Sequence, residues 1–494
     1  MTYPNPTHGL FALIFLVTQS LNAERQYLET NSPIDRFENN LSEPTQWIPS
    51  GTNVALFNIR DRMKYYGVPS VSLAVVHNGT IAWAKAYGLA EIGRAREADA
   101  TTLYQAASLS KTVNALLIMK LVQDGKLSLD QDVRTYLKAW PFPENSFSKD
   151  KPITILQLLS HTAGLSVHGF RGYARGEPIP SLSEMMDGKS PANNEKIRSI
   201  HAPGSMEEYS GGGILLTRQI IEDQTRQTYA SLMTVTILER LKMASSTYSQ
   251  PLPSAIHNVA VGYDENMREI EGRFYTYPEL APDGLWTTPS DYACVIIAIQ
   301  RSLASQPDAI LTSANAQRML TPVLATAALG AFIKEKGGEK YFYHIGKNVG
   351  FSTAFVASFS TGNGVIVMAN SDNDKILDEI INDVASVYNW KKFYDPEVRT
   401  IVDVPDSLKD NLVGDYYCDS PKITAHVAKF DGVLKLNTHT GTANFEKMYF
   451  TGPRRFFLAS SPSTIAEFGG DDARLNGELL ISENGKILFT AKKR

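Results

Sequence analysis

A serine and a lysine stand three residues apart at the start of an apolar segment, and together they could form a nucleophile. Ser108 and Lys111 lead into residues 112–124, where apolar residues recur with helical period. Near a helix N-terminus, unpaired N–H groups favour the negative charge that develops on an attacking oxygen. A lysine three residues further on lies on the same helix face, and burial can let it lose its proton and act as the base.

The Ser-x-x-Lys spacing is not specific by itself, because it occurs three times in the chain. Ser146 and Ser148 also begin such a spacing, but they lie in the polar, proline-bracketed stretch 141–152, which is typical of a loop. A helix-capping serine followed by a solvated lysine would give the same pattern at Ser108. Only Ser108 has a helix to organise it, so we expect the nucleophile there.

A tyrosine further along the chain could complete the proton path of such a site. Tyr209 lies in Glu-Glu-Tyr-Ser-Gly-Gly-Gly, residues 207–213, just before an apolar helical run. A phenol close to cations can acquire a lowered pKa and relay protons. The same residue could equally be a buried structural tyrosine.

The tripeptide His344-Ile345-Gly346 lies on a strand expected over residues 341–346. Glycine permits close approach of the backbone, so the residue after it, Lys347, can turn its N–H toward a bound carbonyl. The pattern His-x-Gly also begins at His77 and His439. The tripeptide at His344 indicates a functional site only because it follows the other two motifs in the expected order.

In that order the chain resembles the serine β-lactamase and penicillin-recognising superfamily, in its class C-like branch. The family has Ser-x-x-Lys, then Tyr-x-Asn, then Lys-Thr-Gly or His-x-Gly, and the resemblance extends over roughly residues 50 to 390. The matching positions and segments are Ser108 with Lys111, Tyr209, His344 with Gly346, residues 153–165 and residues 284–291.

The resemblance implies a role for each matched residue. Ser108 would be the acylated nucleophile, Lys111 its base, and Tyr209 the proton shuttle between nucleophile and leaving group. His344 would stand where many relatives keep a lysine, lining the cleft and assisting the tyrosine. The N–H groups of Ser108 and Lys347 would form the oxyanion hole.

One position departs from the family pattern. Gly211 stands where the second motif has an asparagine, whose amide holds the substrate carbonyl. Losing such a hydrogen bond costs about 1–3 kcal/mol. Esters and D-amino-acid-type peptides therefore rank above β-lactams as expected substrates.

Composition places the chain among ordinary globular proteins. Its 494 residues, 43% of them hydrophobic, predict two or more domains, and a formal net charge of -4 provides no basic field for nucleic acid. We expect the two cysteines, Cys294 and Cys418, to be buried free thiols. Without a His-Glu-x-x-His motif, we expect no metal or organic cofactor.

The N-terminus has the pattern of an export signal. Residues 10–17 form an apolar run, and residues 21–23 offer a cleavage site. We expect a signal peptide over residues 1–23 and a secreted or periplasmic protein. The absence of lysine or arginine before the run leaves an uncleaved anchor as the alternative, and no later apolar stretch is long enough to span a bilayer.

Hydrophobic patterning predicts an α/β (α+β) fold. A helix is expected over residues 53–66, and a helical subdomain is expected between two groups of strands that form an antiparallel sheet flanked by helices. The first group is a hairpin whose runs are joined by Asn78-Gly79. The expected strands are residues 70–76, 80–87, 340–344, 352–359 and 364–369, followed by a helix over 375–388.

We expect residues 34–392 to form this hydrolase domain, residues 393–407 a linker and residues 408–494 a small all-β barrel. The last resembles the lipocalin-like domain appended to some relatives. The sequence thus predicts an exported serine hydrolase acting through an acyl-enzyme on a small ester, amide or peptide. The sequence leaves open whether the protein forms a homo-oligomer. The alternative function is a catalytically idle scaffold that binds through its β domain.

Overall fold

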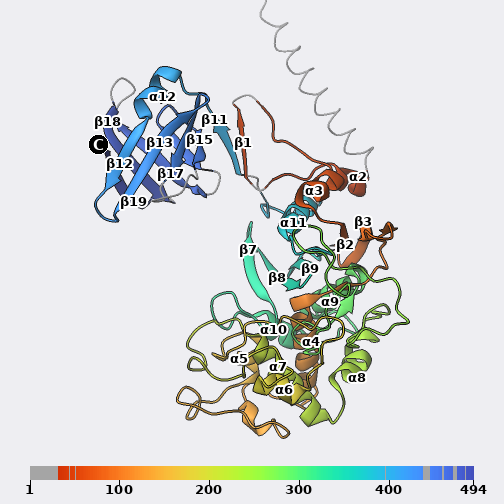
Figure 1. The fold of residues 1–494 in the computed structure, drawn as a ribbon. Coiled ribbons are helices and arrows are strands. Elements are labelled where there is room, and N and C mark those ends of the chain that lie inside the picture. Colours follow the sequence, from red (N-terminus) through yellow and green to blue (C-terminus); the bar gives the residue numbers. More distant parts are fainter. Residues whose placement is uncertain are drawn as a thin grey trace, which may run out of the picture. The chain divides into compact units, whose positions relative to one another are not determined.

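The computed structural model describes residues 32–494 apart from 44, 50–51, 395–396, 438–444, 459–460, 471–474 and 484–485. The expected signal peptide and the tripeptide at His439 lie outside the described residues. The chain divides into two compact units (Figure 1). Unit 1 holds the residues up to Leu41 and Phe57–Tyr394, and unit 2 holds Ser42–Leu56 and Asp395–Arg494.

Unit 1 is built on a seven-stranded antiparallel sheet in the order β4-β3-β2-β10-β9-β8-β7. The hairpin β2–β3 forms as expected, and Asn78 and Gly79 take positive φ values of 51° and 72° in its turn. The strands are β2 (Ser70–His77), β3 (Thr80–Glu91), β4 (Arg96–Glu97), β7 (Phe332–Lys336), β8 (Glu339–Asn348), β9 (Phe351–Ser358) and β10 (Gly364–Ala369).

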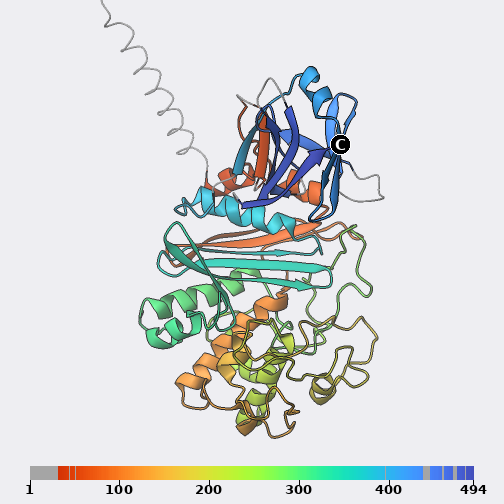
Figure 2. The same cartoon turned by 90° about the vertical axis from the view of Figure 1, so that its left-hand side faces the viewer.

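Both faces of this sheet are buried, each by its own set of helices (Figure 2). Alternate residues of β2 point to opposite faces, so Ala74 and Val76 join one core cluster and Leu73 and Val75 join the other. The helices α3 (Ile59–Tyr66) and α11 (Lys375–Val387) cover one face, and α9 (Pro289–Leu303) covers the other, beside α4 (Ser110–Gln123) and α10 (Ser313–Leu320).

The helical subdomain lies beyond the face that α9 covers, and it contains the chain between β5 and β6 (Figure 1). Its segments pack around α4. This helix is buried nearly all round, because apolar residues occur on every one of its faces. The remaining elements of unit 1 are α2 (Pro33–Glu38), β5 (Tyr104–Gln105), α5 (Ile155–Leu159), α6 (Leu182–Asp187), α7 (Gly211–Thr225), α8 (Tyr229–Met233) and β6 (Trp286–Thr287).

Unit 2 is a closed antiparallel barrel of eight strands, as the sequence predicted. Its strands are β12 (Gly414–Cys418), β13 (Ile423–Phe430), β14 (Val433–Asn437), β15 (Glu446–Phe450), β16 (Arg455–Leu458), β17 (Ser461–Gly470), β18 (Leu475–Glu483) and β19 (Lys486–Lys493), preceded by α12 (Asp406–Leu412). The expected mixed fold and the C-terminal barrel are both confirmed.

Two local expectations are wrong. The stretch 393–407 is not a plain linker, because it contains β11 (Glu397–Ile401), which pairs in parallel with β1 (Thr45–Pro49) inside unit 2. The helix expected from residue 53 begins at Ile59, where the Asn58 side chain accepts the N–H of Arg60 and caps it. Residues 53–56 belong to unit 2 and are not part of this helix.

Both cysteines are free thiols, Cys418 buried in β12 and Cys294 partly buried in α9. Among the described residues, no helix is long and apolar enough to span a membrane.

Candidate active site

Ser108 lies in the short 3-10 turn Ala107–Leu109, directly before α4. The turn packs against β8 and β9 of the sheet. Ala107 has a φ of +49°, which is uncommon for a residue with a Cβ, so the chain bends sharply before the serine. The N-terminus of a buried helix and the end of a sheet strand thus meet at this hydroxyl.

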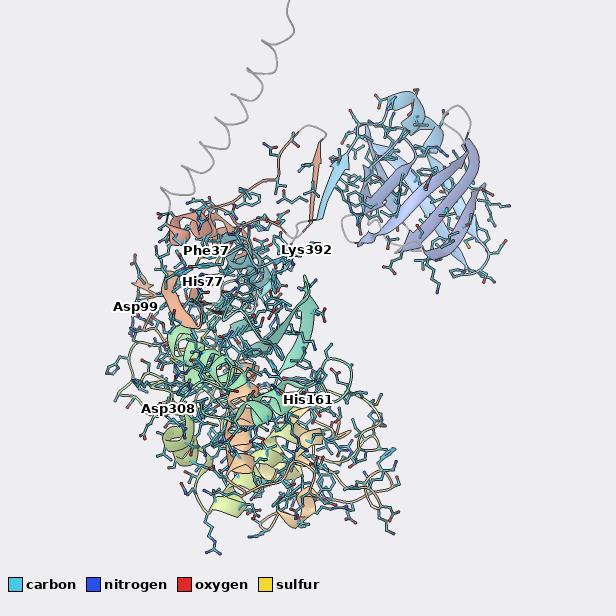
Figure 3. The ribbon with its side chains drawn as sticks, turned by 180° about the vertical axis from the view of Figure 1, so that it is seen from behind. Phe37, His77, Asp99, His161, Asp308 and Lys392 are labelled. Atoms are coloured by element: carbon cyan, nitrogen blue, oxygen red, sulfur yellow. The ribbon has the colours of Figure 1, made fainter. Side chains whose placement is uncertain are left out.

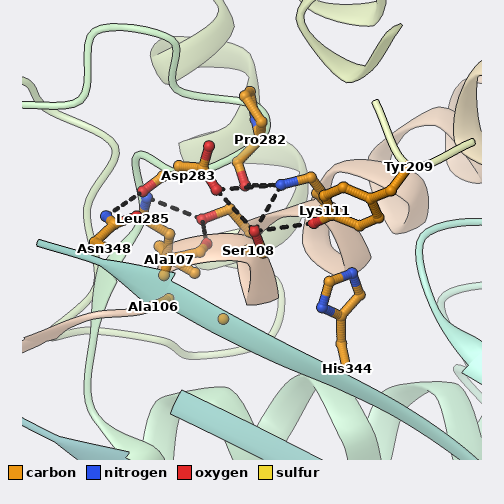
Figure 4. A network of polar contacts seen from close by, with 12 residues as sticks. Ala106, Ala107, Ser108, Lys111, Tyr209, Pro282, Asp283, Leu285, His344 and Asn348 are labelled. Atoms are coloured by element: carbon orange, nitrogen blue, oxygen red, sulfur yellow. Dashed lines mark hydrogen bonds and ion pairs between the residues drawn. The ribbon is translucent and has the colours of Figure 1, made fainter. Parts of the chain in front are cut away.

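Three polar side chains converge on the Ser108 hydroxyl (Figure 4). Lys111 Nζ donates to Ser108 Oγ at 2.8 Å, and the Tyr209 hydroxyl donates at 3.0 Å. Ser108 Oγ in turn donates to Asp283 Oδ1 at 2.9 Å. The structure therefore brings Ser108, Lys111 and Tyr209 together, and it adds a carboxylate that the sequence analysis did not single out.

Lys111 is buried but is not the neutral amine that burial alone would produce. Its Nζ also donates to Pro282 O and to Asp283 Oδ1, both at 3.1 Å. Burial favours a lower pKa, but the Asp283 carboxylate and the Tyr209 oxygen outweigh it and raise the Lys111 pKa above its ordinary value. The sequence analysis expected burial to lower the pKa of Lys111 so that the amine could act as a base. The ion pair with Asp283 instead raises this pKa, which favours the protonated form.

Asp283 is held by its backbone as well as by its side chain. Asn348 Nδ2 donates to Asp283 O at 3.2 Å, and the next residue but one, Leu285, donates its N–H to Ser110 Oγ at 3.2 Å. Ala106 N donates to Leu285 O at 2.9 Å. A carboxylate inside the apolar run from Leu280 to Trp286 was the one available sequence signal, since a buried charge needs a partner.

Tyr209 is positioned by the residues around the start of α7. The next residue, Ser210, caps that helix and donates its N–H to His161 Nδ1 at 3.1 Å. The His161 ring lies 4.3 Å from the Tyr209 ring, centroid to centroid. His161, labelled in Figure 3, thus helps to position Tyr209 by accepting the N–H of the next residue and by packing against the tyrosine ring. Burial and the Lys111 charge keep its pKa well below the ordinary value.

His344 lies beneath Tyr209, with the two ring centroids 6.3 Å apart (Figure 4). Its Nδ1 lies 2.7 Å from Ile345 O, so this nitrogen carries the proton, because a carbonyl only accepts. Its buried Nε2 has no hydrogen-bond partner among the described residues. Burial, together with the Lys111 charge, lowers the His344 pKa to about 3, so the ring is neutral. It therefore lines the site without the charge of the lysine that many relatives keep there.

Gly346 brings β8 close to the nucleophile. A Cβ on this residue would lie 2.8 Å from Ser108 N and 2.6 Å from Thr353 Oγ1, so only glycine fits. The expected oxyanion donors, the N–H groups of Ser108 and Lys347, therefore lie on adjoining backbone segments. The Lys347 side chain is half exposed, with its Nζ 4.0 Å from Asp374 Oδ2.

Gly211, at the first position of α7, leaves little room for the asparagine of the family pattern. A Cβ there would lie 3.0 Å from Phe170 Cε2 and 3.2 Å from His168 O. The glycine also donates its N–H to His168 O at 3.0 Å. The space beside this position is therefore partly filled by the Phe170 ring.

The other two Ser-x-x-Lys serines lie elsewhere, in the loop that the sequence predicted. Ser146 is exposed, and Ser148 is buried within a turn where its Oγ accepts the N–H of Asn145 at 3.3 Å. The hydrogen bonds that join Lys111, Tyr209 and Asp283 converge on Ser108 and involve neither of these serines.

A nucleophile-centred site between an antiparallel sheet and a helical subdomain defines the class of penicillin-recognising serine proteins. The chain belongs to the beta-lactamase family, whose model matches residues 58–385. Protein flp of Staphylococcus aureus (strain N315) is 27% identical over 368 residues, covering 70% of this chain and 67% of that protein. Esterase EstB of Burkholderia gladioli is 27% identical over 201 residues, covering 40% and 50%.

Solved structures share the fold. An octameric penicillin-binding protein homologue from Pyrococcus abyssi has a TM-score of 0.58 and 21% identity, with 88% of this chain and 98% of that chain covered. A D-amino acid amidase from Ochrobactrum anthropi SV3 has a TM-score of 0.55 and 20% identity, with 67% and 97% covered.

Proposed function

We propose that this protein is an exported serine hydrolase that forms an acyl-enzyme at Ser108 on small ester or amide substrates. The observation that carries the proposal is the set of three polar contacts on the Ser108 hydroxyl, from Lys111, Tyr209 and Asp283. A partly buried hydroxyl in contact with a cation, a phenol and a carboxylate is prepared for proton transfer and for attack.

Each residue of the site has a proposed task. Ser108 attacks the substrate carbonyl, and the N–H groups of Ser108 and Lys347 hold the resulting oxyanion. The Lys111 ammonium stabilises the serine oxygen as it loses its proton, and Tyr209 gives a proton to the leaving group. Gly346 keeps β8 close enough for this arrangement, and neutral His344 lines the cleft.

Among substrates, we propose short esters and D-amino-acid-type amides or peptides ahead of β-lactams. The esterase and the D-amino acid amidase among the similar proteins support this order. The lack of an amide at Gly211 also supports it, since Phe170 and His168 crowd the place where the amide would be. A short ester needs that amide least, because its leaving group departs once the oxyanion is held.

The test is covalent labelling by a fluorophosphonate probe, read by intact mass and peptide mapping. We expect one adduct, on Ser108, and none on the Ser108→Ala variant. Ser146→Ala is the matched control, because it removes an exposed serine with the same spacing to a lysine. Labelling that survives Ser108→Ala would contradict the site. A wild-type protein that neither labels nor hydrolyses esters would support the alternative, an idle scaffold that binds through its barrel.

Export is tested separately. Expression of the full chain with a C-terminal tag should yield a mature protein lacking residues 1–23 by mass, and a retained N-terminus would support the anchor.

A further inference from the structure

We propose that Asp283 is a catalytic residue of this site and that its carboxylate, in place of Lys111, accepts the proton of the Ser108 hydroxyl. The inference rests on the proposed function, because it assigns the proton acceptor of the same nucleophile.

The direction of the hydrogen bonds around Lys111 is the first support. An ammonium has three N–H donors and no acceptor. Lys111 Nζ has three acceptors within 3.1 Å, which are Ser108 Oγ, Pro282 O and Asp283 Oδ1. Every proton of the charged form therefore has a place, and the nitrogen offers no lone pair to the serine.

The Ser108 hydroxyl has one proton to give, and its neighbours decide where that proton goes. Lys111 and Tyr209 both donate to Ser108 Oγ, while Asp283 Oδ1 accepts from it at 2.9 Å. An ionised carboxylate can only accept. In the resting site the serine proton is thus already directed at Asp283.

Charge supports the same assignment. The pair of Lys111 and Asp283 is buried, and the pKa of Lys111 is raised above its ordinary value of 10.5. A lysine whose pKa is raised in this way keeps its proton at pH 7 and cannot take the proton of the serine.

The proposed step balances. As Ser108 Oγ forms its bond to the substrate carbon, the O–H bond breaks, the proton passes to Asp283 Oδ1, and the carbonyl electron pair moves onto the oxyanion. Collapse of the oxyanion breaks the bond to the leaving group, which takes the Tyr209 proton. Lys111 then gives a proton to Tyr209 and recovers one from Asp283, so all three groups return to their starting state.

The loop that carries Asp283 is built to hold this geometry. Gly284 N donates to Leu280 O at 2.8 Å, and a Cβ on Gly284 would lie 2.6 Å from Leu280 Cα. The turn is therefore tight and cannot take a side chain there. Together with the Asn348 bond to Asp283 O, this fixes the carboxylate against the nucleophile.

The first experiment uses the wild-type protein. The inactivation rate by a fluorophosphonate is measured from pH 7 to pH 9, with spontaneous probe hydrolysis subtracted. Fluoride leaves without a proton, so the rate reports removal of the serine proton. Several titratable groups lie near Asp283. Lys111 of α4 contacts its carboxylate, and Tyr209 at the start of α7 binds the same Ser108 hydroxyl. His344 lies close to Lys111, and Tyr277 and Glu279 come from the segment just before Asp283.

With Asp283 as acceptor, the rate should stay level to within about threefold, because carboxylates as a class do not change their charge between pH 7 and pH 9. With Lys111 as acceptor, it should rise about tenfold per pH unit. A tenfold rise per unit would overturn the proposal. A wild-type protein that does not react at all would overturn the proposed function instead.

The second experiment compares two carboxyl-to-amide variants. Asp283→Asn should slow inactivation about a hundredfold or more at every pH. Glu279→Gln is the matched control, since Glu279 is a buried carboxyl of the same loop whose oxygens have no hydrogen-bond partner among the described residues, and its rate should stay within about threefold. If Asp283 only kept Lys111 charged, Asp283→Asn would react faster at pH 7, and that result would overturn the proposal. Should Asp283→Asn not fold, the wild-type pH profile decides.

Discussion

Two walls face each other across Ser108, and they treat buried ionisable groups in opposite ways. The carboxylate wall is the part of the loop Pro278–Gly284 that brings Asp283 to Ser108, whereas Glu279 of the same loop has no hydrogen bond to the site. The aromatic wall consists of Tyr209, His161 and His344. On the carboxylate wall Asp283 has the Lys111 ammonium as a partner at 3.1 Å, and this contact raises the pKa of Lys111.

Where a partner is missing, the same burial removes the charge. Burial raises the pKa of Glu279 to about 8, because neither of its oxygens has a hydrogen-bond partner among the described residues. On the aromatic wall it lowers the pKa of His344 to about 3. The comparison teaches that a partner, more than depth, decides the charge of a group here. One wall can therefore take a proton while the other stays neutral.

The largest effect is expected from the aromatic wall, at Tyr209. Tyr209→Phe removes the proposed proton donor, so turnover of an ethyl ester should fall about a thousandfold. A p-nitrophenyl ester should lose only about tenfold, because its phenolate leaves unprotonated. Steady-state hydrolysis of both esters checks this, with Phe332→Leu, which alters a neighbouring ring only, as control. Equal losses on the two esters would remove Tyr209 from the leaving-group step.

The pairing on the carboxylate wall can be broken from the lysine side. Lys111→Met leaves the Asp283 carboxylate buried and unpaired, so the free energy of unfolding of unit 1 should fall by about 3 kcal/mol. Adding Asp283→Asn removes the orphaned charge and should restore most of that loss. Urea unfolding followed in unit 1 measures both values. A double variant no more stable than Lys111→Met alone would contradict the pairing.

The neutral histidine predicts a dependence of stability on pH. The folded pKa of His344, about 3, lies below its ordinary value of 6.5, so the unfolded chain binds the proton more readily. Its contribution is complete above pH 6.5 and is lost as the pH falls toward 3, which amounts to about 2 kcal/mol between pH 7 and pH 5. Between pH 7 and pH 5 the free energy of unfolding of unit 1, measured by urea unfolding, should fall by about 2 kcal/mol less in His344→Gln than in the wild type. His426→Gln, on the barrel, should leave this pH dependence unchanged.

The sequence was sufficient to predict those features that depend on residues close together in the chain. The hairpin turn at Asn78-Gly79, five of the seven sheet strands, α11 and the barrel all follow from hydrophobic period and turn residues, whereas β4 and β7 were not predicted. The convergence of Ser108 and Lys111 follows from helix geometry, since the residues are three apart.

What the sequence could not give depends on contacts between distant segments. Asp283 lies 175 residues from Ser108 along the chain, and the apolar run around it indicates that a partner is needed but does not identify that partner. The charge of Lys111 could not be assigned without it, because helix burial alone points to a lower pKa. Strand β1 was missed for a similar reason, since it pairs with β11 far along the chain.

The smallest effect concerns the edge of the aromatic wall, where Gly211 stands in place of the family asparagine. Gly211→Asn alone should leave the ratio of kcat/KM for nitrocefin to that for p-nitrophenyl butyrate within about twofold, because the new side chain meets Phe170 Cε2 and His168 O. Adding Phe170→Ala opens that space, so an amide could reach a β-lactam carbonyl and raise the ratio about fivefold to tenfold. Phe170→Ala by itself is the control, because it opens the same space without supplying the amide. If the control raises the ratio as much as the double variant, pocket volume governs β-lactam turnover, and the missing amide does not.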